Sequence, residues 1–187
     1  IITHTYSSYF SKIESNFEQF SNSRCSVRSY TGEIIPENTL RQVVNLANNA
    51  PSVCNRQPIK VHLIQNKNLI NKIFDIQGGL KGYTDDLAQM IVLTSDRNYF
   101  YSIGERNQLY IDGGIYLMNL LYALHYYKIA ACPAHWGMSV SVDIQMRNLL
   151  GLHESFQIIS LIAIDFYYLK YIRLLLSIPL LQVIYYQ

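Results

Sequence analysis

Hydrophobic residues recur along the chain at the spacings of helices and of short strands. The clearest helix follows Pro36, a residue that is tolerated in a first helical turn. It should end near residues 48–49, because the residue before Pro51 disfavours helical backbone. Its buried stripe should consist of Leu40, Val43, Val44 and Ala47.

The same periodicities predict the remaining elements. Helices are expected over residues 11–22, 68–74, 107–127 and 142–150, and strands over residues 59–65, 87–94, 129–132 and 156–164. Helices and strands are therefore interleaved, which indicates an α/β or α+β domain around a buried sheet.

The segment 107–127 has almost no polar face. A helix that is apolar on nearly all sides is buried, either in a core or in a subunit interface. Gly113 and Gly114 inside it each cost about 1 kcal/mol relative to Ala. Such glycines are tolerable where another backbone packs closely against them.

Composition narrows the class of protein. The chain has 187 residues, of which 50% are hydrophobic, 15% charged and 13% aromatic. This length fits one domain, and the low charge excludes a disordered chain. The excess of apolar and aromatic residues is typical of an oligomer interface or of a site for a flat aromatic ligand.

Charge and cysteine usage exclude several partners. The net charge is +2 and the basic residues are scattered, so no nucleic-acid partner is expected. The widely spaced Cys25, Cys54 and Cys132 predict neither a disulfide framework nor a metal site. Together with the lack of a recognisable secretion signal, they indicate reduced thiols and a cytoplasmic location. The apolar residues 161–186 are interrupted by charges and by Pro179, so no membrane span is expected.

Familiar catalytic motifs are absent from the sequence. It has no dinucleotide-binding G-x-G-x-x-G, Walker loop, H-E-x-x-H, C-x-x-C or G-x-S-x-G. No catalytic side chain is therefore predicted, and an organic cofactor is the expected chemical agent.

Arg24, Ser26 and Arg28 alternate along a segment that is expected to be extended, so their side chains should project on one face. Two guanidinium groups around a hydroxyl suit a phosphate with a ribityl chain, because Arg binds phosphate bidentately. On spacing alone, two solvated arginines beside a turn are the more common explanation.

Two further segments carry polar groups at the ends of predicted elements. Residues 50–58 (APSVCNRQP) form a loop whose amide side chains suit the edge of a polar heterocycle, although an irregular self-capped connection is more common. Residues 132–137 (CPAHWG) end a predicted strand, where ligands of α/β sheets tend to bind. His135 there is either a group that titrates near neutrality or a structural residue beside Trp136.

Taken together, these segments resemble the FMN-dependent nitroreductase family over about residues 15–164, in the family's order. The motif R-x-S-x-R-x-[FY] is residues 24–30, and the more specific motif A-P-S-x-x-N-x-Q-P is residues 50–58. Asp112-Gly113-Gly114 before an apolar helix looks like the family's central dimer helix. Residues 132–137 sit where the family wraps backbone around the flavin N5 edge.

The resemblance implies an α+β, three-layer fold with a central mixed or antiparallel sheet flanked by helices, assembled as a homodimer with FMN at the interface. It implies a flavoprotein oxidoreductase that passes hydride from NADH or NADPH through flavin N5 to a nitro, quinone or other conjugated acceptor. Donor and acceptor would use the same cleft in turn. The alternative is a non-catalytic flavin-binding or interaction module on the same fold.

The resemblance also assigns residues to the cofactor. One group would hold the phosphate, ribityl and pyrimidine side, the second would reach the FMN of the partner subunit, and the third would approach the isoalloxazine and N5. In that order they are Arg24, Cys25, Ser26 and Arg28; Pro51, Ser52, Asn55 and Gln57; and Lys81, Gly82, Pro133, Ala134 and His135.

The end of the chain departs from the family. One FMN-binding domain is expected over residues 1–164, followed by an atypical tail over residues 165–187. The family continues with Gly-[Tyr/Phe]-Pro and a late Arg or Lys that reaches the phosphate, whereas this chain continues Asp165-Phe166-Tyr167 and stays largely apolar. We expect a reading-frame change or a divergent tail here, which sequencing of the coding region would test.

Overall fold

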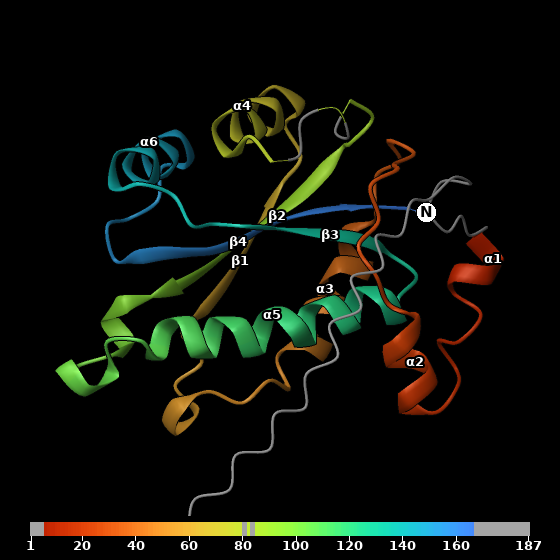
Figure 1. The fold of residues 1–187 in the computed structure, drawn as a ribbon, viewed down its shortest axis with the longest axis horizontal. Coiled ribbons are helices and arrows are strands. Elements are labelled where there is room, and N and C mark those ends of the chain that lie inside the picture. Colours follow the sequence, from red (N-terminus) through yellow and green to blue (C-terminus); the bar gives the residue numbers. More distant parts are fainter. Residues whose placement is uncertain (1–5, 80–81, 83–84, 167–187) are drawn as a thin grey trace, which may run out of the picture.

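The computed structural model describes residues 6–79, 82 and 85–166. Its helices and strands follow one another along the chain (Figure 1). The helices are α1 (Tyr6–Tyr9), α2 (Phe17–Ser23), α3 (Glu37–Ala47), α4 (Lys67–Gln77), α5 (Gln108–Tyr126) and α6 (Val140–Leu150), the short 3-10 turns are η1 (Val53–Asn55), η2 (Arg97–Tyr99) and η3 (Ile103–Glu105), and the strands are β1 (Ile59–Ile64), β2 (Gln89–Asp96), β3 (Ala130–His135) and β4 (Phe156–Asp165).

The four strands form one antiparallel sheet in the order β1-β2-β4-β3. The two central strands pair from Gln89 with Ile164 to Asp96 with Phe156, with a bulge after Leu93. Seven of the eight residues of β2 are buried. This explains why β2 is a continuous apolar run in the sequence rather than an alternating one.

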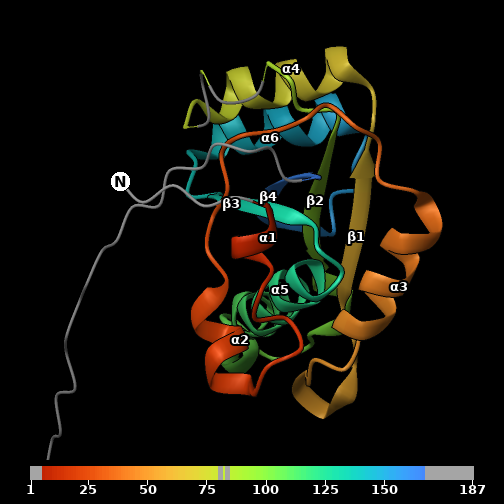
Figure 2. The same cartoon turned by 90° about the vertical axis from the view of Figure 1, so that its right-hand side faces the viewer.

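Helices cover both faces of the sheet, so the fold has three layers. Helices α3 and α5 lie on one face, and α4 and α6 lie on the other (Figures 1 and 2). Each interface holds its own cluster of buried side chains, with Leu120, Leu124 and Ile162 in the first and Ile73, Met146 and Leu161 in the second. The predicted α+β, three-layer fold with an antiparallel sheet is confirmed. The homodimer stays a prediction.

Most predicted elements are found within a few residues of their expected bounds, but the first helix was predicted wrongly. We expected it over residues 11–22, and the structure begins α2 only at Phe17. The amide oxygen of Asn16 accepts a hydrogen bond from the Gln19 backbone N–H at 3.0 Å, which caps the helix there. Phe17, the first residue of α2, is 71% exposed.

Within one chain, the two glycines of the pair have different surroundings. A Cβ atom at Gly113 would lie 2.8 Å from the Ile159 side chain, whereas one at Gly114 would meet nothing within 4 Å. Within one chain, the Ile159 side chain of β4 therefore leaves little room for a Cβ atom at position 113.

Helix α5 packs against the sheet along one side and is exposed on the other side of its first half. Leu120 and Leu124 pack against the sheet, while Tyr110, Ile111 and Ile115 on the opposite side are 53%, 52% and 40% exposed. Gly114 lies on the same exposed side. We call Tyr110, Ile111, Gly114 and Ile115 the outer face of α5.

Three further expectations concern a membrane span, a metal site and the atypical tail. Within the part of the chain that the structure describes, no helix is long and apolar enough to cross a membrane, and no three metal-ligating side chains gather. Asp165, where the atypical tail was expected to begin, is the buried last residue of β4. Residues 167–187 lie outside the described residues.

Candidate functional site

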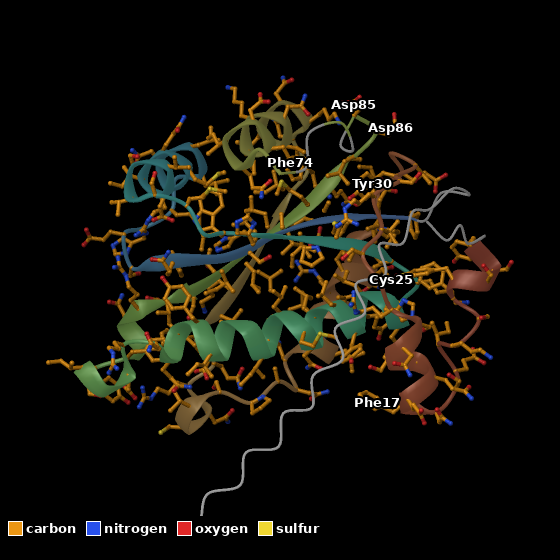
Figure 3. The ribbon with its side chains drawn as sticks, in the orientation of Figure 1. Phe17, Cys25, Tyr30, Phe74, Asp85 and Asp86 are labelled. Atoms are coloured by element: carbon orange, nitrogen blue, oxygen red, sulfur yellow. The ribbon has the colours of Figure 1, made fainter. Side chains whose placement is uncertain are left out.

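The segment with the two predicted arginines runs along the free edge of β3. The backbone N–H of Val27 donates to the Ala131 carbonyl at 3.0 Å, and the Val27 side chain is buried. Figure 3 shows Cys25 beside the start of β3 and Tyr30 farther along the segment. An extended segment with Val27 turned inward leaves its neighbours on either side at the surface, as the alternation predicted.

Arg24, Ser26 and Arg28 lie close enough to Cys132 in β3 to affect its thiol electrostatically. Burial raises the pKa of Cys132 above its usual value, while the charge of Arg28, a hydrogen bond with Ser26 and the charge of Arg24 oppose that rise. The structure therefore brings the first predicted motif to the strand that carries Pro133, Ala134 and His135.

The guanidinium groups of Arg24 and Arg28 can bind an anionic ligand. In the described part of the chain, neither Arg24 nor Arg28 forms an ion pair with a carboxylate. The Nε atom of Arg24 is buried and has no hydrogen-bond partner there. A buried unpaired donor is costly, so this site fits an anionic group such as a phosphate.

A buried aromatic cluster anchors the start of this segment. The His125 imidazole in the last turn of α5 lies 2.8 Å from the Ser23 hydroxyl and contacts the rings of Tyr9, Phe10 and Phe20. Burial, and secondarily the charge of Arg24, lower the pKa of His125 to about 4. His125 is thus neutral near pH 7. Sequence reasoning missed it, because its partners are about a hundred residues distant.

The other end of the segment is fastened by the end of β4. The Asp165 carboxylate accepts hydrogen bonds from the Thr31 hydroxyl at 2.6 Å and the Gly32 N–H at 3.0 Å. Burial raises the pKa of Asp165, although these hydrogen bonds act in the opposite direction. Both ends of residues 23–32 are therefore fixed to the core.

The glycine-rich loop begins next to the end of β3. Buried Gln77 accepts a hydrogen bond from the Gly79 N–H at 2.7 Å, and its amide nitrogen lies 3.5 Å from the His135 carbonyl. His135 is exposed at this strand end. Gly82 adopts a positive φ of 83°, and Lys81 lies outside the described residues.

The loop 50–58 has an unusual backbone. Cys54, Asn55 and Gln57 have φ values of 49°, 54° and 54°, a region that costs non-glycine residues on the order of 1–2 kcal/mol each. The Gln57 N–H donates to the Ser52 hydroxyl at 2.9 Å, and its side-chain amide donates to Asn55 Oδ1 at 2.8 Å. Three predicted residues are thus linked through Gln57. Pro51 is exposed in the same loop.

Buried Asp112 attaches this loop to the start of α5. Its carboxylate accepts hydrogen bonds from the Val53 N–H at 3.2 Å and from the Gln108 side chain at 2.8 Å. The acidic residue of the Asp112-Gly113-Gly114 motif therefore determines where the loop lies.

Within one chain, the two halves of the predicted site do not meet. The loop 50–58 is tied to Asp112 near the beginning of α5, and the arginine segment is tied to His125 near its end. Thirteen residues of α-helix separate these anchors, a span of about 20 Å. Figure 1 shows α2 at one end of α5 and the loop that follows α3 under its other half.

Comparisons with known proteins agree with this geometry. Residues 22–81 match the model of the nitroreductase family and include both sequence motifs. The structure is similar to that of a Clostridium acetobutylicum protein proposed to be an NADH oxidase (TM-score 0.70, 19% identity, covering 82% of this chain and 92% of that one). The chain has the nitroreductase fold. The predicted resemblance is confirmed.

Other nitroreductase structures are similar to a comparable degree. An FMN-dependent nitroreductase from Clostridium difficile R20291 has a TM-score of 0.68 at 16% identity, covering 79% of this chain and 85% of that one. A nitroreductase family protein from Clostridium difficile 630 has a TM-score of 0.66 at 20% identity, covering 81% and 84%. A search of curated proteins finds no significant match.

This nitroreductase fold also carries a groove away from the predicted site. It has a volume of about 510 Å³ and lies between α3 and β1, where its lining includes Leu40, Val61 and Tyr116. No predicted cofactor residue lines this groove among those that the structure describes.

Proposed function

We propose that the chain is an FMN-dependent oxidoreductase that acts as a homodimer and transfers hydride from NADH or NADPH to a nitro, quinone or other conjugated acceptor. The observation that carries the proposal is the separation of the two half-sites along α5. Its outer face is apolar and exposed, as an unpaired interface would be. If a two-fold axis runs perpendicular to α5, the helix pairs antiparallel with its copy. The beginning of each helix then lies beside the end of the other.

Such pairing completes the site. The loop 50–58 of one subunit then approaches the Arg24 segment of the other, so each site takes residues from both chains. This agrees with the assignment of Pro51, Ser52, Asn55 and Gln57 to the FMN of the partner subunit.

The described residues fit the cofactor. Arg24 and Arg28 offer unpaired guanidinium groups to a phosphate, and Ser26 offers a hydroxyl beside them. The strand end with Pro133, Ala134 and His135 and the loop with Gly82 supply backbone for the flat ring. When bound, FMN supplies the hydride-accepting and hydride-donating chemistry. The chain binds and orients it, and no side chain is assigned as general acid or base.

We further propose one cofactor-binding domain over residues 1–164 and a cytoplasmic location. The thiols of Cys25, Cys54 and Cys132 are all free, which supports a reducing compartment.

The first test is titration of the purified protein with FMN, followed by oxidation of NADH and of NADPH with a quinone or a nitroaromatic compound. We expect a yellow protein that is bleached by one or both donors and turns over. A protein that takes up no FMN contradicts the proposal. Bound FMN without any NAD(P)H oxidation supports the non-catalytic module instead.

The shared site has a sharper test in mixed subunits. Arg24→Gln and Asn55→Ala should each weaken FMN binding at every site of their own homodimers. After the two variants are unfolded and refolded together, heterodimers carry one intact site, so about a quarter of all sites should regain native affinity. No regain would show that both residues serve the same chain's site.

A further inference from the structure

Arg56 lies between two predicted cofactor residues, Asn55 and Gln57, but is itself at a variable position of the motif. Asn55 and Gln57 hold left-handed backbone on either side of it, while Arg56 has an ordinary φ of −73°. Three of the four residues 54–57 therefore have a positive φ. Such a backbone conformation persists only where surrounding contacts fix it.

Contacts inside the molecule fix one side of the loop. Asp112 holds the Val53 N–H, Ser52 holds the Gln57 N–H, and the Gln57 side chain reaches the Ala50 carbonyl at 3.2 Å. These bonds join the loop to itself and to α5. None of these hydrogen bonds attaches the loop to residues 97–106.

Arg56 supplies that second attachment through three contacts to residues 97–106. Its Nη2 atom lies 2.8 Å from a Glu105 carboxylate oxygen, and its Nη1 donates to the Tyr99 carbonyl at 2.8 Å. The guanidinium lies 4.1 Å above the ring of Tyr101. The Arg56 and Glu105 side chains are 13% and 17% exposed, so their ion pair is partly shielded from solvent, whereas Tyr101 is largely exposed.

Glu105 is in turn held by its own segment. Its carboxylate accepts the Tyr101 N–H at 3.0 Å and the Ser102 N–H at 3.3 Å. The hydrogen bond with Arg56, followed by these backbone donors, lowers the pKa of Glu105. Arg56 therefore binds a carboxylate that the backbone of the segment 97–106 already orients.

We propose that Arg56 is a positioning residue for the cofactor site: it clamps the loop 50–58 to residues 97–106 and so holds Asn55 and Gln57 in the conformation that binds FMN. This inference rests on the proposed function. Its mechanical part, the clamp, is independent of any cofactor.

The chemistry of the clamp requires arginine. A guanidinium donates in two directions from one plane while its face stacks on an aromatic ring, whereas a lysine ammonium is a single point of charge. Arg56→Lys keeps the charge next to Glu105 but loses the fork and the stacking, and Arg56→Gln loses the charge as well. Arg41→Gln is a matched control, because the Arg41–Glu37 ion pair is exposed on α3 and distant from the loop.

The experiment measures amide hydrogen exchange without FMN, and FMN affinity by quenching of flavin fluorescence, for the wild type and these variants. In Arg56→Gln, we expect the Val53 and Gln57 amides to exchange about tenfold faster, with β2 amides unchanged. We expect the FMN dissociation constant to rise about tenfold. Arg56→Lys should fall between, and Arg41→Gln should match the wild type.

Each other outcome overturns the inference. Unchanged exchange at Val53 and Gln57 removes the clamp, and equally faster exchange in β2 shows a general loss of stability. Faster loop exchange with unchanged FMN affinity removes the link to the cofactor. A wild type that binds no FMN contradicts the proposed function instead, and the exchange data then still decide whether Arg56 is a clamp.

Discussion

The imidazole Nε2 of His125 lies 2.8 Å from the hydroxyl of Ser23, and this contact joins the end of α5 to the residue before Arg24. The Ser23 hydroxyl donates its own proton to the Phe20 carbonyl at 2.7 Å, so it accepts the proton of Nε2. Nδ1 is then unprotonated, and it is buried without a partner in the described part of the protein. Protonating it would place a second positive charge near Arg24.

The first prediction is a loss of stability below pH 6.5. An unfolded chain protonates His125 near pH 6.5, whereas the folded protein resists until about pH 4. As the pH falls between these values, the unfolded state takes up the proton first and the free energy of unfolding decreases. We expect a decrease of up to about 1.4 kcal/mol per pH unit, measured by urea unfolding.

His125→Gln is the matched variant for this measurement. Its stability is lower at pH 7 because the ring packing is lost, but the pH dependence due to position 125 disappears. The difference between wild type and variant should therefore shrink as the pH falls from 6.5 to 4. A constant difference would contradict the buried neutral imidazole.

The second prediction concerns the glycine pair in α5. Gly113→Ala should destabilise the fold by about 1–3 kcal/mol, because its Cβ would overlap the Ile159 side chain at 2.8 Å. Gly114→Ala meets open space within one chain, so helix propensity should stabilise the chain by up to about 1 kcal/mol. Thermal unfolding of both variants at low protein concentration measures the contrast. Similar losses in both would contradict it.

The third prediction concerns the outer face of α5. Ile111→Glu should turn the homodimer into monomers and abolish FMN binding together, because each site needs both chains. Ile144→Glu on α6 is the control, since Ile144 is also 52% exposed. Sedimentation velocity reports the oligomeric state. A dimer that survives Ile111→Glu with FMN bound would place the interface elsewhere.

The fourth prediction separates the phosphate from the ring of the cofactor. Arg24→Gln should weaken FMN binding about tenfold to a hundredfold, the usual effect of losing a charged hydrogen bond. Riboflavin, which lacks the phosphate, should bind wild type and Arg24→Gln with similar affinity. Equal losses for both ligands would assign Arg24 to a general structural role.

The sequence predicts the fold well where local physics decides it. The continuous apolar run of β2 predicts a buried strand. The apolar stripe that begins with Leu40 after Pro36 predicts a helix, and both are found. The start of α2 was predicted wrongly because a single cap, Asn16, outweighed the hydrophobic spacing that predicted a helix from residue 11. Capping is a local signal, so this boundary is predictable from Asn16 in the sequence.

The site was predictable only where residues of one motif lie close in sequence. Arg24, Ser26 and Arg28 alternate along one strand-like segment, and their spacing is visible without a structure. The contacts of Arg56 with Glu105 and of Ser23 with His125 join residues 49 and 102 positions apart. No periodicity reports such pairs, because the tertiary fold alone decides which surfaces meet.

The strand order also governs how the protein can fold as it is synthesised. β4 is the last strand that the structure describes, yet it lies between β2 and β3. Until residues 156–165 have left the ribosome, β3 has no neighbouring strand and β2 has only β1. Before β4 is available, a nascent chain therefore exposes two unpaired apolar strand edges, which are open to pairing with other chains.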